Sequence, residues 1–163
     1  MPAPLVIRRH LQAPRDLVWA VWSDPAHLLR WWGPKGLQIG LGGFSFVEGG
    51  HFHFSMDLPD GTRWWASFRY QEISPPTRLR FTNSFTDDQR NIQPAPFPGD
   101  WPVQIAYTVT FEEVEGGTLL TLEGEAYEAS PAEIAFFAAA RPDMEAGFAG
   151  TFDQLEAHLA DVT

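Results

Sequence analysis

The sequence predicts an α+β fold in which a curved antiparallel sheet wraps around a long C-terminal helix. Apolar and polar residues alternate with a period of two through much of the stretch from Leu37 to Ala126, which is typical of strands that bury one face. Near the C-terminus, apolar residues instead recur every three or four positions, as they do on one face of a helix. Because the apolar face of a sheet must be covered, and the last helix is the only element long enough, we expect that helix to lie on the sheet.

Length and composition are those of a single domain covering residues 1–163. A chain of 163 residues can bury about two thirds of its unfolded surface without the help of a disulfide or a metal, and this chain has no cysteine. Its net charge of −10 disfavours binding to nucleic acid or anionic membranes. No apolar run approaches the roughly 20 residues that span a bilayer. Because Met1-Pro2-Ala3-Pro4 does not begin a signal peptide, we expect a cytoplasmic protein without membrane insertion.

The first elements are a strand and two short helices. Leu5–Leu11 has the composition of a strand. A helix is expected from Ala13-Pro14, because proline suits a first helical turn. Ser23-Asp24-Pro25 ends that helix and caps a second one, which Gly33-Pro34 stops.

The middle of the chain predicts consecutive strands joined by turns. His51–Leu58 alternates without interruption, and Pro59–Thr62 contains the Asp-Gly pair that is typical of hairpins. Strands joined by short turns pair in antiparallel fashion. Asp87–Asp100 is polar and rich in proline, which predicts a long loop. Further strands are expected at Arg63–Ile73, Leu79–Phe85, Val103–Phe111 and Thr118–Ala126.

Helical signals return at the end of the chain. Ser130-Pro131-Ala132-Glu133 forms a capping box with proline at the first helical position. Arg141-Pro142 is expected to break this helix, and Asp143 to cap the last one. Gly147 and Gly150 lie beside the apolar stripe of the last helix, where small residues would let the sheet or a ligand approach its backbone. The stripe itself consists of Met144, Phe148, Phe152 (or Thr151), Leu155 and Leu159.

A series of short motifs runs along nearly the whole chain. The first are Leu11–Trp19, Trp22–Pro25 and Trp31–Pro34. The later ones are Gly49–Phe52, Asp60–Thr62, Tyr70–Pro76, Arg78–Thr82, Gly117–Leu122, Gly147-Phe148 and Phe152–Leu155. Together they resemble the Hsp90-ATPase-activator-homologue-1-like family of the START/Bet v 1-like (SRPBCC) superfamily.

This resemblance implies a helix-grip fold with a cavity between the sheet and the C-terminal helix. It does not imply one activity, because the superfamily includes lipid and hormone carriers, aromatase/cyclase-type enzymes and a co-chaperone domain. The chain departs from the family at Ile39–Phe44, which lacks the charged residues often found before the double glycine. It also departs at the long loop that ends near Trp101.

Ten residues are candidates for the lining of this cavity. Most inward apolar residues serve packing, so each is also a candidate for the core. Alternation with Phe68 and Tyr70 favours an inward Trp64 and an outward, exposed Trp65, unless a bulge intervenes. The candidates are Trp31, Trp32, Phe54, Met56, Trp64, Phe68, Phe85, Tyr107, Phe148 and Phe152.

His51 and His53 share one face of their strand with Asp57, and this spacing can chelate a metal. The opposite face carries the apolar residues, so we expect both histidines to face solvent and to bind no metal. Arg63, Arg69 or Glu72 could reach into a pocket, although a solvated position is expected for each. The sequence lacks the familiar nucleophile, zinc and phosphate-loop motifs, so it predicts no catalytic residue and no cofactor.

The sequence therefore predicts a binding protein for a small hydrophobic or aromatic molecule. One alternative is a cyclase or hydrolase that uses the same cavity, which requires a titratable group inside it with a shifted pKa. Another is a protein-interaction module of the co-chaperone kind, which requires an exposed apolar patch. Either Trp65 or the loop around Phe97 would supply such a patch, and a homodimer could form through the same patch.

Overall fold

The computed structural model describes residues 3–163, which form one seven-stranded antiparallel sheet and four helices. The strands are β1 (Leu5–Leu11), β2 (Gln38–Ser45), β3 (His51–Asp57), β4 (Arg63–Ser74), β5 (Arg78–Thr86), β6 (Ile105–Val114) and β7 (Gly117–Ala126). The helices are α1 (Arg15–Ser23), α2 (Pro25–Trp31), α3 (Pro131–Ala139) and α4 (Arg141–Val162).

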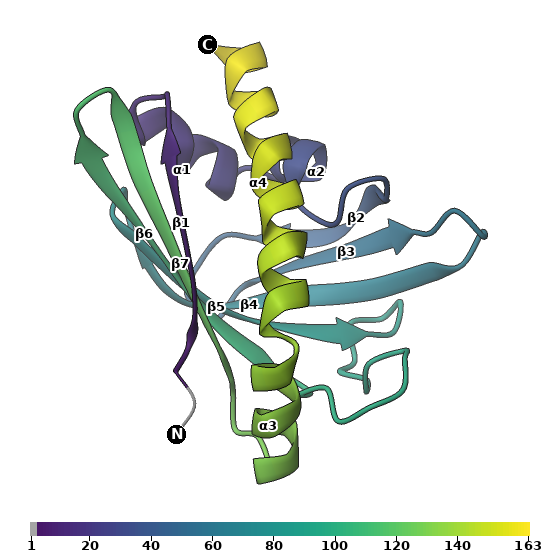
Figure 1. Cartoon of the computed structure of the whole chain (residues 1–163). Coiled ribbons are helices and arrows are strands. Elements are labelled where there is room, and N and C mark those ends of the chain that lie inside the picture. The colour runs from purple at the N-terminus through teal and green to yellow at the C-terminus, as the bar shows by residue number, and fades with distance from the viewer. Residues whose placement is uncertain (1–2) are drawn as a thin grey trace.

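The sheet curves around α4, as the sequence predicts (Figure 1). Its strand order is β1-β7-β6-β5-β4-β3-β2, so β1 and β2 form the two edges. Both α1 and α2 lie at the end of the sheet near the C-terminus of α4, whereas α3 lies at the other end (Figure 1). The architecture is therefore an α+β helix grip.

Capping interactions fix the starts of two helices, α2 and α3. The Asp24 carboxylate accepts a hydrogen bond of 2.9 Å from the Ala26 backbone N–H and starts α2. Ser130 and Glu133 form the predicted capping box of α3. The prediction that Asp143 caps the last helix is wrong, because α4 begins at Arg141 and only Ala140 separates it from α3. Pro142 lies in the first turn of α4, where it interrupts no helical hydrogen bond.

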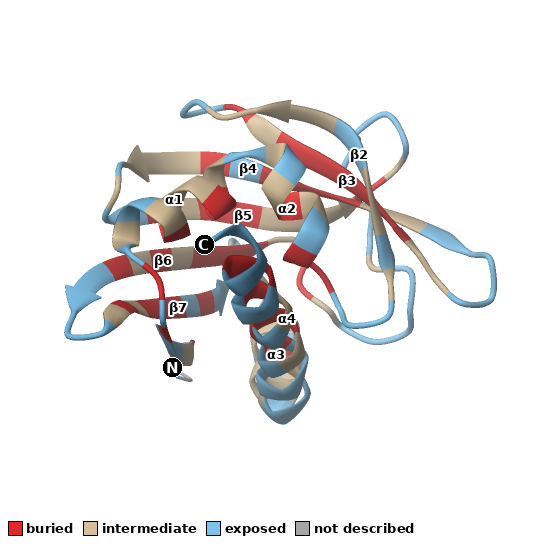
Figure 2. Cartoon of the chain, turned by 90° about the horizontal axis from the view of Figure 1, so that it is seen from above, coloured by how far each residue is buried: buried red, intermediate tan, exposed pale blue. Residues whose placement is uncertain are grey.

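The core lies between the inner face of the sheet and α4 (Figure 2). Phe68 and Phe81 stack at its centre, with ring centroids 4.1 Å apart. On α4, the predicted stripe is buried at Phe148, Thr151, Phe152, Leu155 and Leu159. At roughly 25 cal/mol per Å² of apolar surface, burial of such rings is the main stabilising contribution.

Polar contacts hold α4 in register with the sheet and with α2. Arg9 on β1 forms an ion pair with Asp153 at 3.0 Å and another with Glu156. The Gly33 carbonyl, just after α2, accepts hydrogen bonds from Thr151 Oγ1 and Gln154 Nε2, each at 2.9 Å. These contacts join α4 to the edge strand β1 and to the turn after α2.

Residues 87–104 form the predicted long loop, and β6 begins at Ile105 rather than at Val103. A ladder of rings ties the loop to the body of the protein. Phe97 packs on Trp64 and Trp101, and Trp101 packs on Phe137 of α3 with ring centroids 5.7 Å apart. Within residues 3–163, no helix combines the length and apolar character that crossing a membrane requires.

Candidate functional site

A cavity of about 210 Å³ lies between the inner face of the sheet and the first half of α4. Strands β3, β4, β5 and β6 form its floor, and α4, the turn after α2 and the long loop form its other walls. Pro34, Asp143 and Gly147 line it and are exposed, so the cavity opens to solvent beside them. The other lining residues are Trp32, Gly33, Phe54, Met56, Ala66, Asn83, Ser84, Phe85, Trp101, Ile105, Tyr107, Met144, Phe148 and Thr151.

Six of the ten residues proposed from the sequence line this cavity. Four of the six lie on strands, and the alternation of side chains along each strand explains why they face the cavity. Met56 on β3 and Phe85 on β5 point to the same side as the buried Phe54 and Phe81. The six residues are Trp32, Phe54, Met56, Phe85, Tyr107 and Phe148.

The other four candidates lie outside the lining and belong to the core around it. Trp31 is buried, and its Nε1 donates a hydrogen bond of 3.0 Å to the Val21 carbonyl. Phe68 lies beneath Trp32, with ring centroids 4.9 Å apart. Phe152 is buried one turn beyond Phe148 on α4.

Trp64 is the fourth candidate outside the lining. It pairs with Met56 across β3 and β4 and therefore lies on the inner face of the sheet, as alternation favours. It packs against Phe85 and Phe97 at the end of the sheet. Phe97 closes over it from the long loop, a contact that alternation within strands cannot predict.

Asn83, a polar residue of the cavity floor, is not among the residues proposed from the sequence. Asn83 lies between Phe81 and Phe85 on β5, so the same alternation that points both rings inward also points its carboxamide inward. Its Oδ1 atom is buried and has no hydrogen-bond partner within the described part of the chain. A buried, unpaired carbonyl oxygen costs roughly 1–3 kcal/mol in general, and this oxygen is covered by protein atoms and not open to the cavity.

The Tyr107 ring occupies the space that Gly124 leaves on the neighbouring strand. The two residues are paired across β6 and β7, and a Cβ atom at Gly124 would lie 2.8 Å from Tyr107 Cε1. Glycine at this position therefore lets the tyrosine ring lie close to β7. Burial raises the pKa of the Tyr107 hydroxyl, which keeps the phenol neutral and able to donate a hydrogen bond.

Gly147 and Gly150 do not mark a close approach of the sheet to α4. A Cβ atom at Gly147 would meet nothing within 4 Å, and one at Gly150 would lie 3.7 Å from Lys35 Cβ. Gly147 does line the cavity. It therefore widens the opening rather than bringing the two layers together.

The outer face of β3 differs from the sequence-based prediction. His53 is buried rather than solvent-facing, because its ring stacks on Trp65 with centroids 4.8 Å apart and its Nε2 lies 3.1 Å from Thr86 Oγ1. Burial lowers the pKa of His53. Trp65 points outward but is half-buried, so the expectation of an exposed tryptophan is wrong. Within residues 3–163, no three histidine, aspartate or glutamate side chains form a group that could hold a metal ion.

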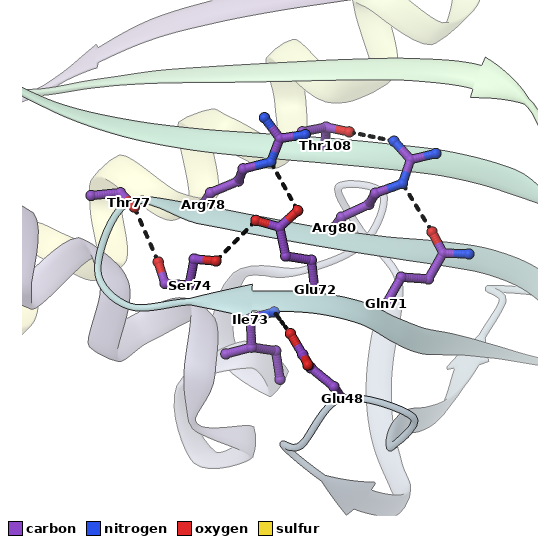
Figure 3. Close-up of polar contacts among 9 residues, drawn as sticks. All are labelled: Glu48, Gln71, Glu72, Ile73, Ser74, Thr77, Arg78, Arg80 and Thr108. Carbon is purple, nitrogen blue, oxygen red and sulfur yellow. Dashed lines mark hydrogen bonds and ion pairs between the residues drawn. The ribbon is translucent and has the colours of Figure 1, made fainter.

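The charged side chains of β4 do not enter the cavity. Arg63 pairs with Asp57 at 2.6 Å, and Arg69 is exposed. A bulge in β4 between Tyr70 and Glu72 puts Gln71 and Glu72 on the same outer side, where Glu72 meets Arg78 (Figure 3). The Glu72 carboxylate accepts hydrogen bonds from Arg78 at 3.1 Å and from Ser74 at 2.9 Å. The Gln71 side-chain oxygen accepts one from Arg80 at 3.0 Å.

Comparisons with known proteins place this geometry in a wider group. The family model described as activator of Hsp90 ATPase homolog 1-like protein matches residues 12–160. The search of curated proteins gave no match to this chain.

Solved structures of bacterial proteins share the fold. A solution structure from Arthrobacter aurescens has a TM-score of 0.80 and 27 % identity, with 98 % of this chain and 87 % of that chain covered. A crystal structure from Chromobacterium violaceum has a TM-score of 0.72 and 25 % identity, with 98 % of each chain covered. The AHSA1 protein from Silicibacter pomeroyi has a TM-score of 0.73 and 22 % identity, with 99 % of this chain and 100 % of that chain covered.

Proposed function

We propose, from the premise that this chain belongs to the activator of Hsp90 ATPase homolog 1-like family, that residues 1–163 form a single domain that binds a small, largely apolar molecule. The molecule occupies the cavity between the sheet and α4. The family resemblance seen in the sequence is confirmed by the match over residues 12–160. Members of one fold serve several functions, so the proposal depends on the site and not on the fold.

The observation that carries this proposal is an open cavity of about 210 Å³ with mainly apolar walls. Engineered apolar cavities of about 150 Å³ bind benzene, so this volume admits one or two fused rings. Ligand sites typically combine apolar walls with a few polar groups that fix orientation. Here aromatic rings supply the walls, and Asn83 and Tyr107 supply polar groups.

Filling the cavity tests this function. Ala66 is buried on β4 and lines the cavity, so Ala66→Leu places three additional carbon atoms in the space that the ligand would occupy. Ala146→Leu adds the same atoms at an exposed position on α4 and serves as the matched control. We expect Ala66→Leu to weaken the binding of an apolar fluorescent dye at least tenfold and Ala146→Leu to leave it unchanged.

Dye titration with the wild-type protein and both variants measures this effect, and circular dichroism establishes that each variant is folded. A wild-type protein that binds no apolar dye contradicts the proposal. Equal dye affinities of the wild type and a folded Ala66→Leu protein also contradict it, because the dye would then bind elsewhere.

A further inference from the structure

We infer that the cavity selects a small aromatic molecule with an uncharged hydrogen-bond acceptor, such as the oxygen of a ketone or an aldehyde, and that the hydroxyl group of Tyr107 donates to this acceptor. The inference rests on the proposed function, because it specifies which apolar molecules the cavity prefers. It depends on the fixed position of the Tyr107 ring, on the openness of its hydroxyl group and on the other donors of the cavity walls.

The ring of Tyr107 is held in one position beside the cavity. Its centroid lies 5.6 Å from that of Phe81 on β5 and 5.6 Å from that of Phe148 on α4. On the side of β7, the absence of a side chain at Gly124 leaves the space that the ring fills. Because this ring is already packed on three sides, its hydroxyl group loses little conformational freedom when it binds a ligand.

The hydroxyl group of Tyr107 is open to the cavity. Tyr107 lines the cavity and is 3 % exposed. Burial raises the pKa of its hydroxyl group, and no hydrogen bond within residues 3–163 contributes to this rise. The Tyr70 hydroxyl is enclosed by protein atoms without a partner, whereas the Tyr107 hydroxyl is not enclosed in this way. A hydroxyl group that is neither bonded nor enclosed faces open space, and the open space beside Tyr107 is this cavity.

Two further side chains of the lining carry hydrogen-bond donors. The indole N–H groups of Trp32 and Trp101 are not enclosed, and neither has a partner in the described part of the chain. An indole N–H group can donate but not accept. The Thr151 hydroxyl already donates to the Gly33 carbonyl at 2.9 Å, and the Asp143 carboxylate lies at the opening. The walls inside the opening therefore suit a ligand that accepts hydrogen bonds.

An aromatic ketone fits both the rings and the donors of these walls. Its planar ring can make the offset or edge-to-face contacts that aromatic side chains prefer. Its oxygen can accept a hydrogen bond from the Tyr107 hydroxyl. A hydrocarbon of the same shape forms no such bond and leaves the buried hydroxyl group unpaired, which costs affinity.

Two nearly isosteric probes and one variant test the inference. Acetophenone and α-methylstyrene share their shape and differ by a carbonyl oxygen in place of a CH₂ group. Isothermal titration of the full chain measures both dissociation constants in the wild type and in Tyr107→Phe. Because the two probes differ in hydration, the quantity to compare is the ratio of their affinities before and after the substitution. We expect Tyr107→Phe to weaken acetophenone about tenfold relative to α-methylstyrene.

Tyr127→Phe is the matched control, since Tyr127 lies outside the lining and its loss of a hydroxyl group should keep the wild-type ratio. Circular dichroism establishes that each variant is folded. An affinity ratio that is the same in the wild type and in a folded Tyr107→Phe protein overturns the inference.

Infrared spectroscopy of ¹³C-labelled acetophenone detects the hydrogen bond itself. A hydrogen bond to the oxygen lowers the stretching frequency of a carbonyl group, whereas apolar packing does not. We expect the frequency of the bound probe to be lower in the wild type than in Tyr107→Phe. If this variant does not fold, the reference is acetophenone dissolved in hexane, and a bound probe with the hexane frequency overturns the inference.

The outcomes separate this inference from the proposed function. If both probes bind but the Tyr107 hydroxyl affects neither the affinity ratio nor the carbonyl frequency, the inference fails and an apolar binding site remains. If neither acetophenone nor α-methylstyrene binds, the proposed function and the inference fail together.

Discussion

Gly124 leaves the space beside β7 that the Tyr107 ring occupies. Because a methyl group at Gly124 would lie 2.8 Å from Tyr107 Cε1 and 3.0 Å from Cδ1, Gly124→Ala must push the ring away from β7. We expect this variant to lose about 1–3 kcal/mol of stability, as overpacked cores do, and to bind apolar dyes more weakly. Urea unfolding and dye titration measure both effects. Unchanged stability and affinity would show that the ring does not depend on this glycine.

At the residue scale, alternation along strands predicts which side chains face inward but not how much space they leave. It placed Phe54, Met56, Phe85 and Tyr107 correctly on the inner face, and all four line the cavity. The same rule applied to Asn83 would have found the polar group on the floor. The burial of His53 could not be predicted, because it depends on Trp65 and Thr86 from other strands.

The contact between α2 and α4 contains a pair of histidines. His158 on α4 lies with its Nε2 2.8 Å from His27 Nδ1 on α2. Burial lowers the pKa of His158 below its ordinary value of 6.5, and the positive charges of His27 and Arg30 lower it further, whereas Asp161 acts in the opposite direction. His158 therefore binds fewer protons in the folded protein than in the unfolded chain just below pH 6.5.

This difference predicts that the free energy of unfolding falls as the pH is lowered from 7.5 to 5. Stability is lost as the pH drops through the ordinary histidine value, and the loss is complete only below the lower pKa of the folded state. His53, whose pKa is also lowered by burial, adds to the same trend. Urea unfolding at several pH values measures the slope, which His158→Gln should reduce. An identical slope in the wild type and the variant would show that the pair does not titrate in this way.

The long loop is held on α3 by a close contact at Gly99. Gly99 has a φ of +115°, and a Cβ atom there would lie 2.5 Å from the Phe136 ring. Gly99→Ala therefore strains the backbone at residue 99 and places the new methyl group against the Phe136 ring. We expect it to release residues 87–104 and withdraw Trp101 from the cavity. Hydrogen exchange should become faster in this loop while the core of β5 and β6 stays protected; unchanged exchange in the loop would refute the prediction.

At the scale of elements, local signals predicted most helices and strands, whereas contacts across the chain decided the rest. The Ser130 capping box and the Asp60-Gly61 hairpin turn each depend on only a few neighbouring residues, and the structure contains both. The prediction that the last helix starts after Asp143 is wrong, because the first turn of α4 follows α3 almost directly. The loop was predicted by its prolines, but its docking on Trp64 and Phe137 involves residues distant in sequence.

At the scale of the whole molecule, the cavity results from incomplete contact between the sheet and α4. Tyr107 and Phe148 meet across the two layers, with ring centroids 5.6 Å apart. Beside that contact, Ala66 and Gly147 supply little or no side chain, and the space between them stays open. The curved sheet and the long helix were predictable from periodicity. The volume left between them depends on side-chain packing and is seen only in the structure.

Methyl NMR with xenon tests most directly whether this space accepts an apolar guest. Two of the three methionines, Met56 and Met144, line the cavity, so their ¹³C-labelled methyl groups report on its contents. Xenon is uncharged and apolar and enters dry cavities independently of hydrogen bonding. We predict that increasing xenon pressure shifts both methyl signals along saturating curves with the same binding constant. Methyl signals that do not shift would contradict the account, because the cavity would then be closed or filled.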